Sequence, residues 1–350
     1  MSTFRFRDWL RPHLRNLRPY SSARSEFSGR ANVFLDANEN PEDTGFNRYP
    51  DPLQKDLRRL LSGIKAVSPE SMFIGNGSDE PIDLLMRAFC NPGTDNIVIT
   101  DPTYGMYQVS ASIHDVQVRK VPLRKDFSLD AAAVLRACDA NTRLVFLCSP
   151  NNPTGDVLGR NAMLRVIRQF PGPVVVDEAY IDFCPEESLV KRLNSLPNLV
   201  ILQTLSKAWG LAGSRLGLCF GTPELTGILN AIKPPYNISQ PAQEAAYKRL
   251  RRGRAAMEKS VGRILSERAR LEQVFSDMNL KVFPSAANFL LVRFPDAAGM
   301  FQSLKRKGVI VRDRSLELHC NGCLRITVGT RKENTVLIKA IRQILHGTLN

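Results

Sequence analysis

Six short apolar runs, separated by longer segments of helical periodicity, constrain the fold of this chain more than any other feature. The runs are Ile97-Val98-Ile99, Val116-Gln117-Val118, Leu144 to Leu147, Val174-Val175-Val176, Val200-Ile201-Leu202 and Leu216 to Phe220. Strands that alternate with helical segments indicate βαβ units, which build a mainly parallel sheet sandwiched between helices. The sequence therefore predicts an α/β fold with a mainly parallel central sheet.

The pattern changes after about residue 243. A long helical stretch from Gln243 to Met278 carries apolar residues at helical spacing, with basic residues between them. Predicted strands at 289–292, 309–311 and 324–328 and a terminal helix follow it. We predict an N-terminal arm at 1–45 with one short helix, a large domain at 46–245 and a smaller α/β domain at 246–350. A single domain with a long surface helix is the open alternative.

The composition is ordinary for a folded globular protein, and it bounds the possible partners. Of the 350 residues 43% are hydrophobic, and no apolar stretch approaches the ~20 residues that cross a bilayer. The net charge of +14 suggests nucleic-acid binding as a hypothesis, but the basic residues are dispersed and no aromatic-basic repeat accompanies them. We therefore favour a soluble protein with a basic surface that attracts small anions, and expect neither nucleic acid nor membrane as a partner.

Cysteine usage and the first thirty residues bear on metal binding and compartment. Five of the seven cysteines lie in or beside apolar segments, where reduced thiols act as small hydrophobes. The pair Cys320 and Cys323 has metal-knuckle spacing, but no second pair completes four ligands, so we favour a turn and expect no metal. The arginine-rich start suggests a transit peptide, yet it lacks an apolar signal core. We expect a cytoplasmic protein.

Lys207, Asp177 and Arg215 each follow or end an apolar run, and together they have the chemistry that binds pyridoxal phosphate. A lysine amine can bond covalently to the cofactor aldehyde and can act as a general base at the substrate α-carbon. A carboxylate at the pyridine nitrogen keeps the ring protonated. Asp177 closes the run Val174-Val175-Val176, so it emerges at the carboxyl end of a strand, where open α/β sheets build their sites.

Further segments extend this site. Asn152, in a turn rich in Pro and Asn, and Tyr180 can reach a ring oxygen of the cofactor. Gly77-Ser78-Asp79 opens a helical pattern, which suits a phosphate, and Ser206 and Arg215 can add a hydroxyl and a bidentate cation. Each feature alone has a plainer interpretation, such as a solvated lysine, an N-cap or an ordinary turn. Their joint occurrence carries the prediction.

The chain resembles the fold-type I pyridoxal-phosphate aminotransferases, and among them it is most similar to the histidinol-phosphate aminotransferases. The similarity runs from about Arg11 to about Leu345. The most specific segments are Leu35-Asp36-Ala37-Asn38-Glu39-Asn40-Pro41, Arg48-Tyr49-Pro50-Asp51-Pro52, Val176-Asp177-Glu178-Ala179-Tyr180, the segment around Lys207, and Cys323-Leu324-Arg325-Ile326-Thr327-Val328-Gly329. Glu42-Asp43-Thr44-Gly45 departs from the family, whose members often carry an aromatic residue and Gly-Pro there.

The resemblance implies a role for each site residue. Lys207, Asp177 and Tyr180 would be catalytic, with Asp177 at the pyridine nitrogen. Asn152 and Tyr180 would hold the ring oxygen, Tyr104 would stack on the ring, and Gly77, Ser78, Asp79, Ser206 and Arg215 would hold the phosphate. Arg325, Arg312 and Asn38 would bind substrate, although a surface ion pair is the open alternative for Arg312. Tyr49 would reach the cofactor of the partner subunit, which implies a homodimer.

The implied reaction is transamination of L-histidinol phosphate with 2-oxoglutarate, which gives imidazole acetol phosphate and L-glutamate in histidine biosynthesis. The implied partners are therefore small anionic substrates. Three alternatives stay open: an aminotransferase for aromatic amino acids, a decarboxylase of threonine phosphate, and a cofactor-binding regulator without turnover. The regulator would need a separate DNA-binding module, for which residues 1–45 are short.

Overall fold

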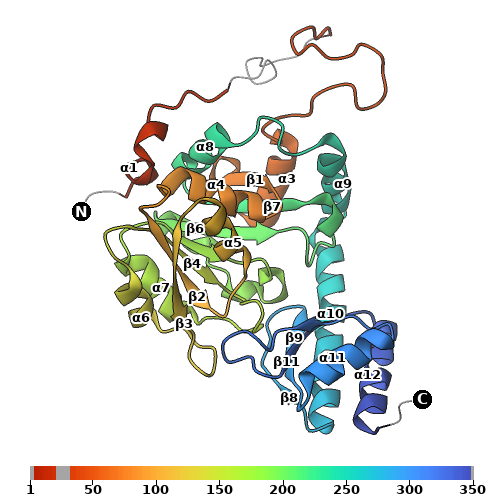
Figure 1. Ribbon diagram of the computed structural model, residues 1–350. Coiled ribbons are helices and arrows are strands. Elements are labelled where there is room, and N and C mark those ends of the chain that lie inside the picture. The colour runs from red at the N-terminus through yellow and green to blue at the C-terminus, as the bar shows by residue number, and fades with distance from the viewer. Residues whose placement is uncertain (1–3, 21–31, 348–350) are drawn as a thin grey trace.

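The computed structural model describes residues 4–20 and 32–347, so residues 1–3 and 21–31 of the predicted arm lie outside the described part (Figure 1). Its strands are β1 (Met72–Asn76), β2 (Asn96–Asp101), β3 (Gln117–Pro122), β4 (Thr142–Cys148), β5 (Val174–Asp177), β6 (Leu199–Thr204), β7 (Leu216–Phe220), β8 (Lys281–Val282), β9 (Phe289–Arg293), β10 (Arg312–Asp313) and β11 (Cys323–Thr327). The α-helices are α1 (Phe6–Trp9), α3 (Lys55–Lys65), α4 (Asp79–Phe89), α5 (Met106–Ile113), α6 (Ala131–Ala137), α7 (Arg160–Gln169), α8 (Pro223–Ile232), α9 (Gln240–Arg251), α10 (Gly253–Asp277), α11 (Ala297–Arg306) and α12 (Arg331–Leu345). Short 3-10 helices are η1 (Pro12–Leu14), η2 (Pro69–Ser71), η3 (Ile181–Phe183), η4 (Pro185–Glu187), η5 (Val190–Ser195) and η6 (Ala212–Ser214).

The larger sheet has the strand order β1-β7-β6-β5-β4-β2-β3. Strands β6, β5, β4, β2 and β3 pair in parallel, whereas β7 is antiparallel to both of its neighbours. Because β1 and β6 both run opposite to β7, they point in the same direction as the parallel strands. The prediction of an α/β fold with a mainly parallel sheet is confirmed.

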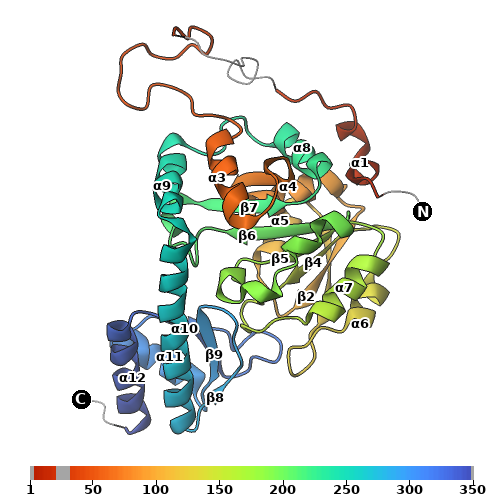
Figure 2. The ribbon, with the colours of Figure 1, turned by 180° about the vertical axis from the view of Figure 1, so that it is seen from behind.

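Both faces of this sheet are buried except at the edge strand β3, which explains why the strands other than β3 are mainly apolar. Along β5, Val174 and Val176 face one apolar cluster and Val175 faces the other. Helices α3, α6, α7 and α9 contribute to the first cluster, and α1, α4, α5 and α8 contribute to the second. Figures 1 and 2 show these helices on opposite faces of the sheet.

The smaller sheet is antiparallel, with the order β10-β11-β9-β8. It has a separate apolar cluster to which α10, α11 and α12 contribute. Helix α10 runs from beside the larger sheet down to the smaller one, as Figures 1 and 2 show. Its two ends therefore pack in different clusters, with Met257 and Val261 in the first and Leu271 and Phe275 in the third.

Two predicted elements were wrong in detail. The helical stretch from Gln243 to Met278 is divided into α9 and α10, because Gly253 has a φ of +80°, which ends one helix before the next begins. The apolar run at 309–311 is not a strand, and the paired residues are Arg312 and Asp313 directly after it. Ile310 is 74% exposed, whereas Val309 and Val311 are partly buried against the apolar cluster of the smaller sheet.

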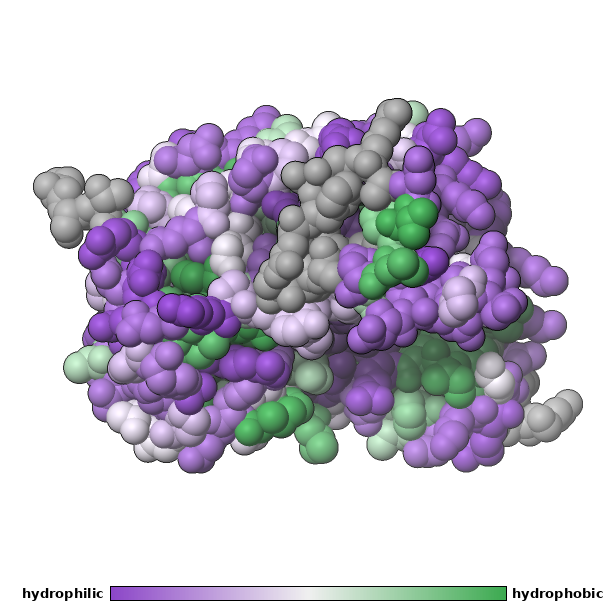
Figure 3. Space-filling model, turned by 90° about the horizontal axis from the view of Figure 1, so that it is seen from above, coloured by the Kyte–Doolittle hydropathy of each residue, from purple (hydrophilic) through white to green (hydrophobic). Residues whose placement is uncertain are grey.

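The described part of the arm consists of residues 4–20 and 32–45. It contains α1 and η1, and residues 32–54 form no regular element. Several large apolar side chains of this segment are exposed, namely Val33, Leu35, Phe46 and Tyr49. Seen from above, the surface is mainly hydrophilic with separate hydrophobic patches (Figure 3). Within residues 4–20 and 32–347, no helix is long and apolar enough to cross a bilayer.

Candidate active site

The carboxyl ends of five strands meet at one edge of the larger sheet. Thr204 ends β6 shortly before Lys207, and Asp177 ends β5. Cys148 ends β4 before Asn152, and Asp101 ends β2 before Tyr104. Strand β1 points the same way and leads into Gly77 and Ser78. Parallel strands thus bring residues more than a hundred positions apart to one place.

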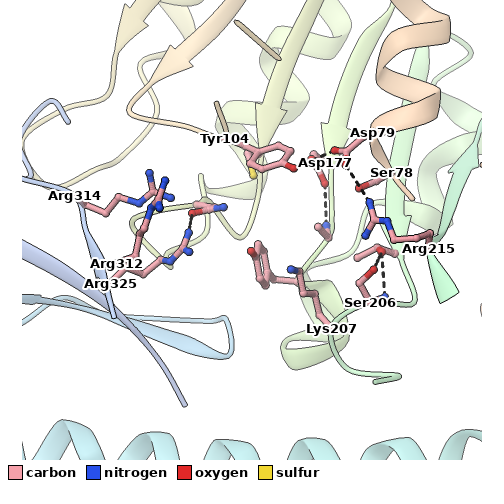
Figure 4. A pocket seen from close by; sticks show the side chains of 15 residues that line it. Ser78, Asp79, Tyr104, Asp177, Ser206, Lys207, Arg215, Arg312, Arg314 and Arg325 are labelled. Carbon is pink, nitrogen blue, oxygen red and sulfur yellow. Dashed lines mark hydrogen bonds and ion pairs between the residues drawn. The ribbon is translucent and has the colours of Figure 1, made fainter. Parts of the chain in front are cut away.

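A cavity of about 380 Å³ lies at this edge, between the larger sheet and the smaller one. Its wall contains most of the predicted site residues, which are Ser78, Asp79, Tyr104, Asn152, Asp177, Tyr180, Ser206, Lys207, Arg215, Arg312 and Arg325. Cys148, Ala179, Thr204 and Arg314 complete the lining. Figure 4 shows Lys207 and Arg215 on one side of the space, and Arg312, Arg314 and Arg325 on the other.

Asp177 is a buried carboxylate without a cationic partner among the described residues. Its Oδ1 accepts from the Ala179 N–H at 3.0 Å, and its Oδ2 accepts from the Tyr107 hydroxyl at 2.6 Å. Burial raises the pKa of Asp177 to about 6, and the Tyr107 hydrogen bond opposes that rise. A cation that approached from the cavity would stabilise the ionised form.

Lys207 lies in the turn after β6, with its amine 5.6 Å from the centre of the Tyr180 ring. Solvent reaches this side chain through the open cavity, but the cavity walls remove part of its hydration. This desolvation, followed by the charges of Arg325 and Arg215, lowers the pKa of Lys207. A larger fraction of the amine is therefore neutral at a given pH, as a nucleophile or a general base requires.

The same wall, built by the larger sheet, also has the features of a phosphate site. Helix α4 begins at Asp79, its N-cap Ser78 makes no side-chain capping bond, and both residues line the cavity, so the N-terminus of this helix lies at the cavity wall. Gly77 has a φ of +73°, and a Cβ there would lie 2.6 Å from the Arg215 guanidinium. A Cβ on Gly217 would lie 2.2 Å from the Gly77 backbone. Both glycines are thus needed for this close packing.

Asp79 organises this wall through its side chain. Its carboxylate accepts from the Tyr104 hydroxyl at 3.0 Å and from Arg215 at 3.3 Å. The Ser206 hydroxyl accepts from Thr204 Oγ1 at 3.0 Å. These contacts fix a tyrosine, an arginine and a hydroxyl around one wall of the cavity, with the hydrogen-bonding capacity that a phosphate and an aromatic ring need.

Asn152 and Tyr180 lie between the two walls. Asn152 is buried, and its Oδ1 accepts from Arg325 at 2.5 Å. Within the described part of the chain, neither Asn152 Nδ2 nor the Tyr180 hydroxyl has a hydrogen-bond partner. Tyr180 packs edge-on against Phe289 of the smaller sheet, with ring centres 5.2 Å apart. Two free donors at this position suit a ring oxygen.

Three arginines of the smaller sheet form the remaining wall. Arg312 and Arg325 are direct cross-strand partners on β10 and β11. Burial, then the charges of Arg314 and Arg312, lower the pKa of Arg325. Glu317 accepts from Arg314 at 2.7 Å, and no other ion pair to these guanidinium groups occurs among the described residues. This wall therefore carries net positive charge and suits an anion.

Two predicted site residues lie away from this cavity in the single chain. Tyr49 is 51% exposed and stacks on Tyr236 with ring centres 4.4 Å apart. Tyr236 lines an adjacent cavity of about 410 Å³ that shares Arg215 with the first. Asn38 has a φ of +54° and is exposed on the arm. The roles assigned to Tyr49 and Asn38 stay predictions.

Lys233 explains how the segment near Tyr236 is held. Its ammonium donates to the carbonyls of Pro52, Pro234 and Pro235 and to Asn237 Oδ1, at 2.8 to 3.2 Å. This side chain is buried, and burial lowers its pKa to about 8. The contact to Pro52 ties the segment that carries Tyr49 to the segment that carries Tyr236. Four carbonyl partners of one amine have no sequence signature, so the sequence did not predict this role.

The wall of the cavity fits pyridoxal phosphate. A buried carboxylate without a cationic partner, an amine with lowered pKa and a glycine-lined helix N-terminus beside an arginine match the ring nitrogen, aldehyde and phosphate of that cofactor. The second group of cations, on the smaller sheet, is separate from the first and is free for another anion.

Comparisons with known proteins agree with this geometry. The family described as "Aminotransferase class I and II" matches residues 27–341. A histidinol-phosphate aminotransferase from Parabacteroides distasonis is 52% identical over 340 residues, which cover 97% of this chain and 98% of that protein.

Solved structures show the same fold. The histidinol-phosphate aminotransferase from Sinorhizobium meliloti in complex with pyridoxal-5'-phosphate has a TM-score of 0.79 at 25% identity, covering 87% of this chain and 85% of that one. The L-threonine-O-3-phosphate decarboxylase from Porphyromonas gingivalis has a TM-score of 0.71 at 24% identity, covering 86% and 91%, a likeness that shows the fold alone. By its family match and its near full-length identity, the chain belongs to the class I and II aminotransferases and, among them, to the histidinol-phosphate aminotransferases.

Proposed function

We propose that this chain uses pyridoxal phosphate to transfer the amino group of L-histidinol phosphate to 2-oxoglutarate, giving imidazole acetol phosphate and L-glutamate. The observation that carries the proposal is one cavity with a cofactor-like wall, around Lys207 and Asp177, and a separate arginine wall for the substrate anion. The 52% identity over 97% of the chain to a protein named for this activity supports the choice of substrate.

Each residue of the first wall has a defined task in the proposed reaction. The bound cofactor supplies an electron-withdrawing ring that stabilises negative charge at the substrate α-carbon. Asp177 would hold a proton on the ring nitrogen, and Asn152 Nδ2 and the Tyr180 hydroxyl would donate to the ring oxygen. Lys207 would bind the aldehyde and, once substrate has replaced it, take the α-proton at Nζ. Its lowered pKa favours the neutral amine that both tasks need.

The second wall would orient the substrate. Arg325 lies 5.4 Å over the Phe289 ring and donates to Asn152, so its guanidinium is held from two sides. Arg312 lies opposite it across the strand pair. A phosphate or a carboxylate bound here would place the substrate amino group toward Lys207. The same cations would serve both half-reactions, because each amino donor and keto acceptor carries an anionic end.

We also propose that the active unit is a homodimer and that the arm, large domain and small domain divide at 1–45, 46–245 and 246–350. The exposed apolar residues Val33, Leu35, Phe46 and Tyr49 support a partner that covers the arm. In this arrangement Tyr49 of the partner subunit would approach the shared Arg215 through the cavity that Tyr236 lines. Sedimentation equilibrium tests the dimer, and a monomer at micromolar concentration would contradict it.

The substrate assignment is tested by a panel of amines under saturating 2-oxoglutarate. We expect kcat/KM for histidinol phosphate to exceed that for phenylalanine or tyrosine by about 100-fold or more, because a phosphate makes more charge-assisted bonds to arginine than a carboxylate does. The reverse order would favour the aromatic alternative. Release of carbon dioxide from threonine phosphate would favour the decarboxylase, and cofactor binding without turnover of any amine would favour the regulator.

A further inference from the structure

Tyr107 is a buried tyrosine that does not line the cavity yet contacts the central carboxylate. It lies three residues after Tyr104 in the first turn of α5, and its side chain is fully buried. Its hydroxyl donates to Asp177 Oδ2 at 2.6 Å, and its ring stacks on Phe146 at 4.9 Å between ring centres. Buried hydroxyl groups are almost always hydrogen-bonded, and in this fold the partner of the Tyr107 hydroxyl is the Asp177 carboxylate.

Building on the proposed cofactor, we propose that Tyr107 is a positioning residue that orients the Asp177 carboxylate toward the ring nitrogen and keeps it ionised. The Ala179 N–H and the Tyr107 hydroxyl bind different carboxylate oxygens, so together they fix the rotation of the carboxylate plane. Each carboxylate oxygen has two acceptor sites, so a third donor can still bind from the cavity side.

The hydrogen bond from Tyr107 affects the ionisation of Asp177, because the other groups around this carboxylate act in opposite directions. Asp79 of α4 disfavours the carboxylate anion, whereas the Tyr107 hydroxyl, the Ala179 N–H and Lys207 favour it. Burial outweighs these favourable contacts and raises the pKa of Asp177 to about 6. No ion pair to Asp177 exists among the described residues, so loss of the phenol would raise this pKa further.

Tyr107→Phe tests the proposal because it removes the hydroxyl and keeps the ring. We expect the dissociation constant for pyridoxal phosphate, measured by equilibrium dialysis on the full chain after removal and return of the cofactor, to increase about 10-fold at neutral pH. The acid limb of cofactor affinity should also move up by about one pH unit, because binding needs the ionised carboxylate and affinity is lost as the pH falls through its pKa.

Two control variants separate positioning from packing. Phe146→Leu disturbs the contact with the Tyr107 ring and keeps the hydroxyl, so it should alter thermal stability without moving the acid limb. In an Asp177→Asn background, Tyr107→Phe should have less than about a twofold further effect on cofactor affinity, because the two residues act as one unit.

The outcomes distinguish this inference from the proposed function. If wild-type protein does not bind pyridoxal phosphate, the proposed function itself is wrong. If wild-type protein binds it and Tyr107→Phe keeps the same affinity and the same acid limb, only the role of Tyr107 is overturned. Equal effects of Tyr107→Phe with and without the Asp177 carboxylate would also overturn it.

Discussion

The two walls of the cavity differ in how many of their charged side chains already have a hydrogen-bond or ion-pair partner within the protein. On the wall built by the larger sheet, the side chains of Asp177, Asp79 and Arg215 each have hydrogen-bond partners before any ligand is considered. On the wall built by the smaller sheet, the only carboxylate bound to a cation, within the described part of the chain, is Glu317 on Arg314. The first wall is preorganised, as a cofactor that stays bound requires, and the second keeps its charge for anions that exchange.

This difference follows from the secondary structure beneath each wall. The carboxyl ends of β1, β2, β4, β5 and β6 are fixed in one sheet with both faces buried. On the arginine wall, Arg325 lies on β11, but Arg312 lies on β10, a two-residue edge strand, and Arg314 directly follows that strand. A short edge strand can shift with its sheet more easily than the end of a central strand, which suits a wall that must accept several substrates in turn.

The largest expected effect is on the preorganised wall. Lys207→Ala should lower kcat by about 10⁴-fold or more, because it removes both the covalent attachment and the general base. Lys207→Arg is the matched control, since it keeps the positive charge but its guanidinium stays protonated and can neither bond to the aldehyde nor take a proton. Stopped-flow measurement of the glutamate half-reaction checks this, and turnover by either variant within tenfold of wild type would contradict the assigned role.

On the arginine wall, Arg325→Ala should lower kcat/KM for both histidinol phosphate and glutamate by about 100-fold. Its guanidinium is held in position by Asn152 and Phe289. Arg325→Lys should recover only part of this loss, because an ammonium cannot bind an anion and Asn152 in the same bidentate geometry. A loss confined to one substrate would show that the wall is not shared.

Arg314→Gln should have a smaller and more selective effect. We expect about a 10-fold lower kcat/KM for the phosphorylated amine and less than about a 3-fold change for glutamate, because a dianion gains more from a third cation than a carboxylate does. Arg306→Gln on α11 removes the same charge outside the cavity wall and should leave both values unchanged. If Arg314→Gln and Arg306→Gln had equal effects, Arg314 would act only through the overall positive charge of the protein and not through contact with the phosphate.

The smallest effect concerns stability. Burial raises the pKa of Asp177 to about 6 from its ordinary 3.8, so the cofactor-free folded state binds the proton more tightly than the unfolded state. Stability should therefore fall as the pH rises through this window, and Asp177→Asn should remove that fall. We expect the cofactor-free variant to melt at the wild-type temperature or about 1–3 °C above it near pH 8. Differential scanning calorimetry would contradict this if the variant were clearly less stable.

The sequence pattern located three residues of the preorganised wall, because each of them follows an apolar run. Lys207, Asp177 and Asn152 could be located at strand ends without coordinates. Their signal is local, since a buried parallel strand followed by a polar residue marks the edge where such sites lie.

The remaining features depend on contacts that a linear pattern does not carry. Tyr107 lies in an apolar helix and resembles an ordinary core aromatic, although its position three residues after Tyr104 was an available signal. No sequence pattern singled out Arg314, which the fold places in the cavity wall. The contact between Arg325 and Asn152 joins residues 173 positions apart. The run at 309–311 was misassigned because β-branched residues favour strands even where no partner strand is available.

The central claim is that one amine, Lys207, bonds to pyridoxal phosphate opposite the Asp177 carboxylate. It is tested most directly by borohydride reduction of the loaded protein, proteolysis and mass mapping of the peptides. The account predicts a single stable phosphopyridoxyl modification on the peptide that contains Lys207, and its loss in Lys207→Ala. Modification of a different lysine, or none in protein that retains activity, would contradict it.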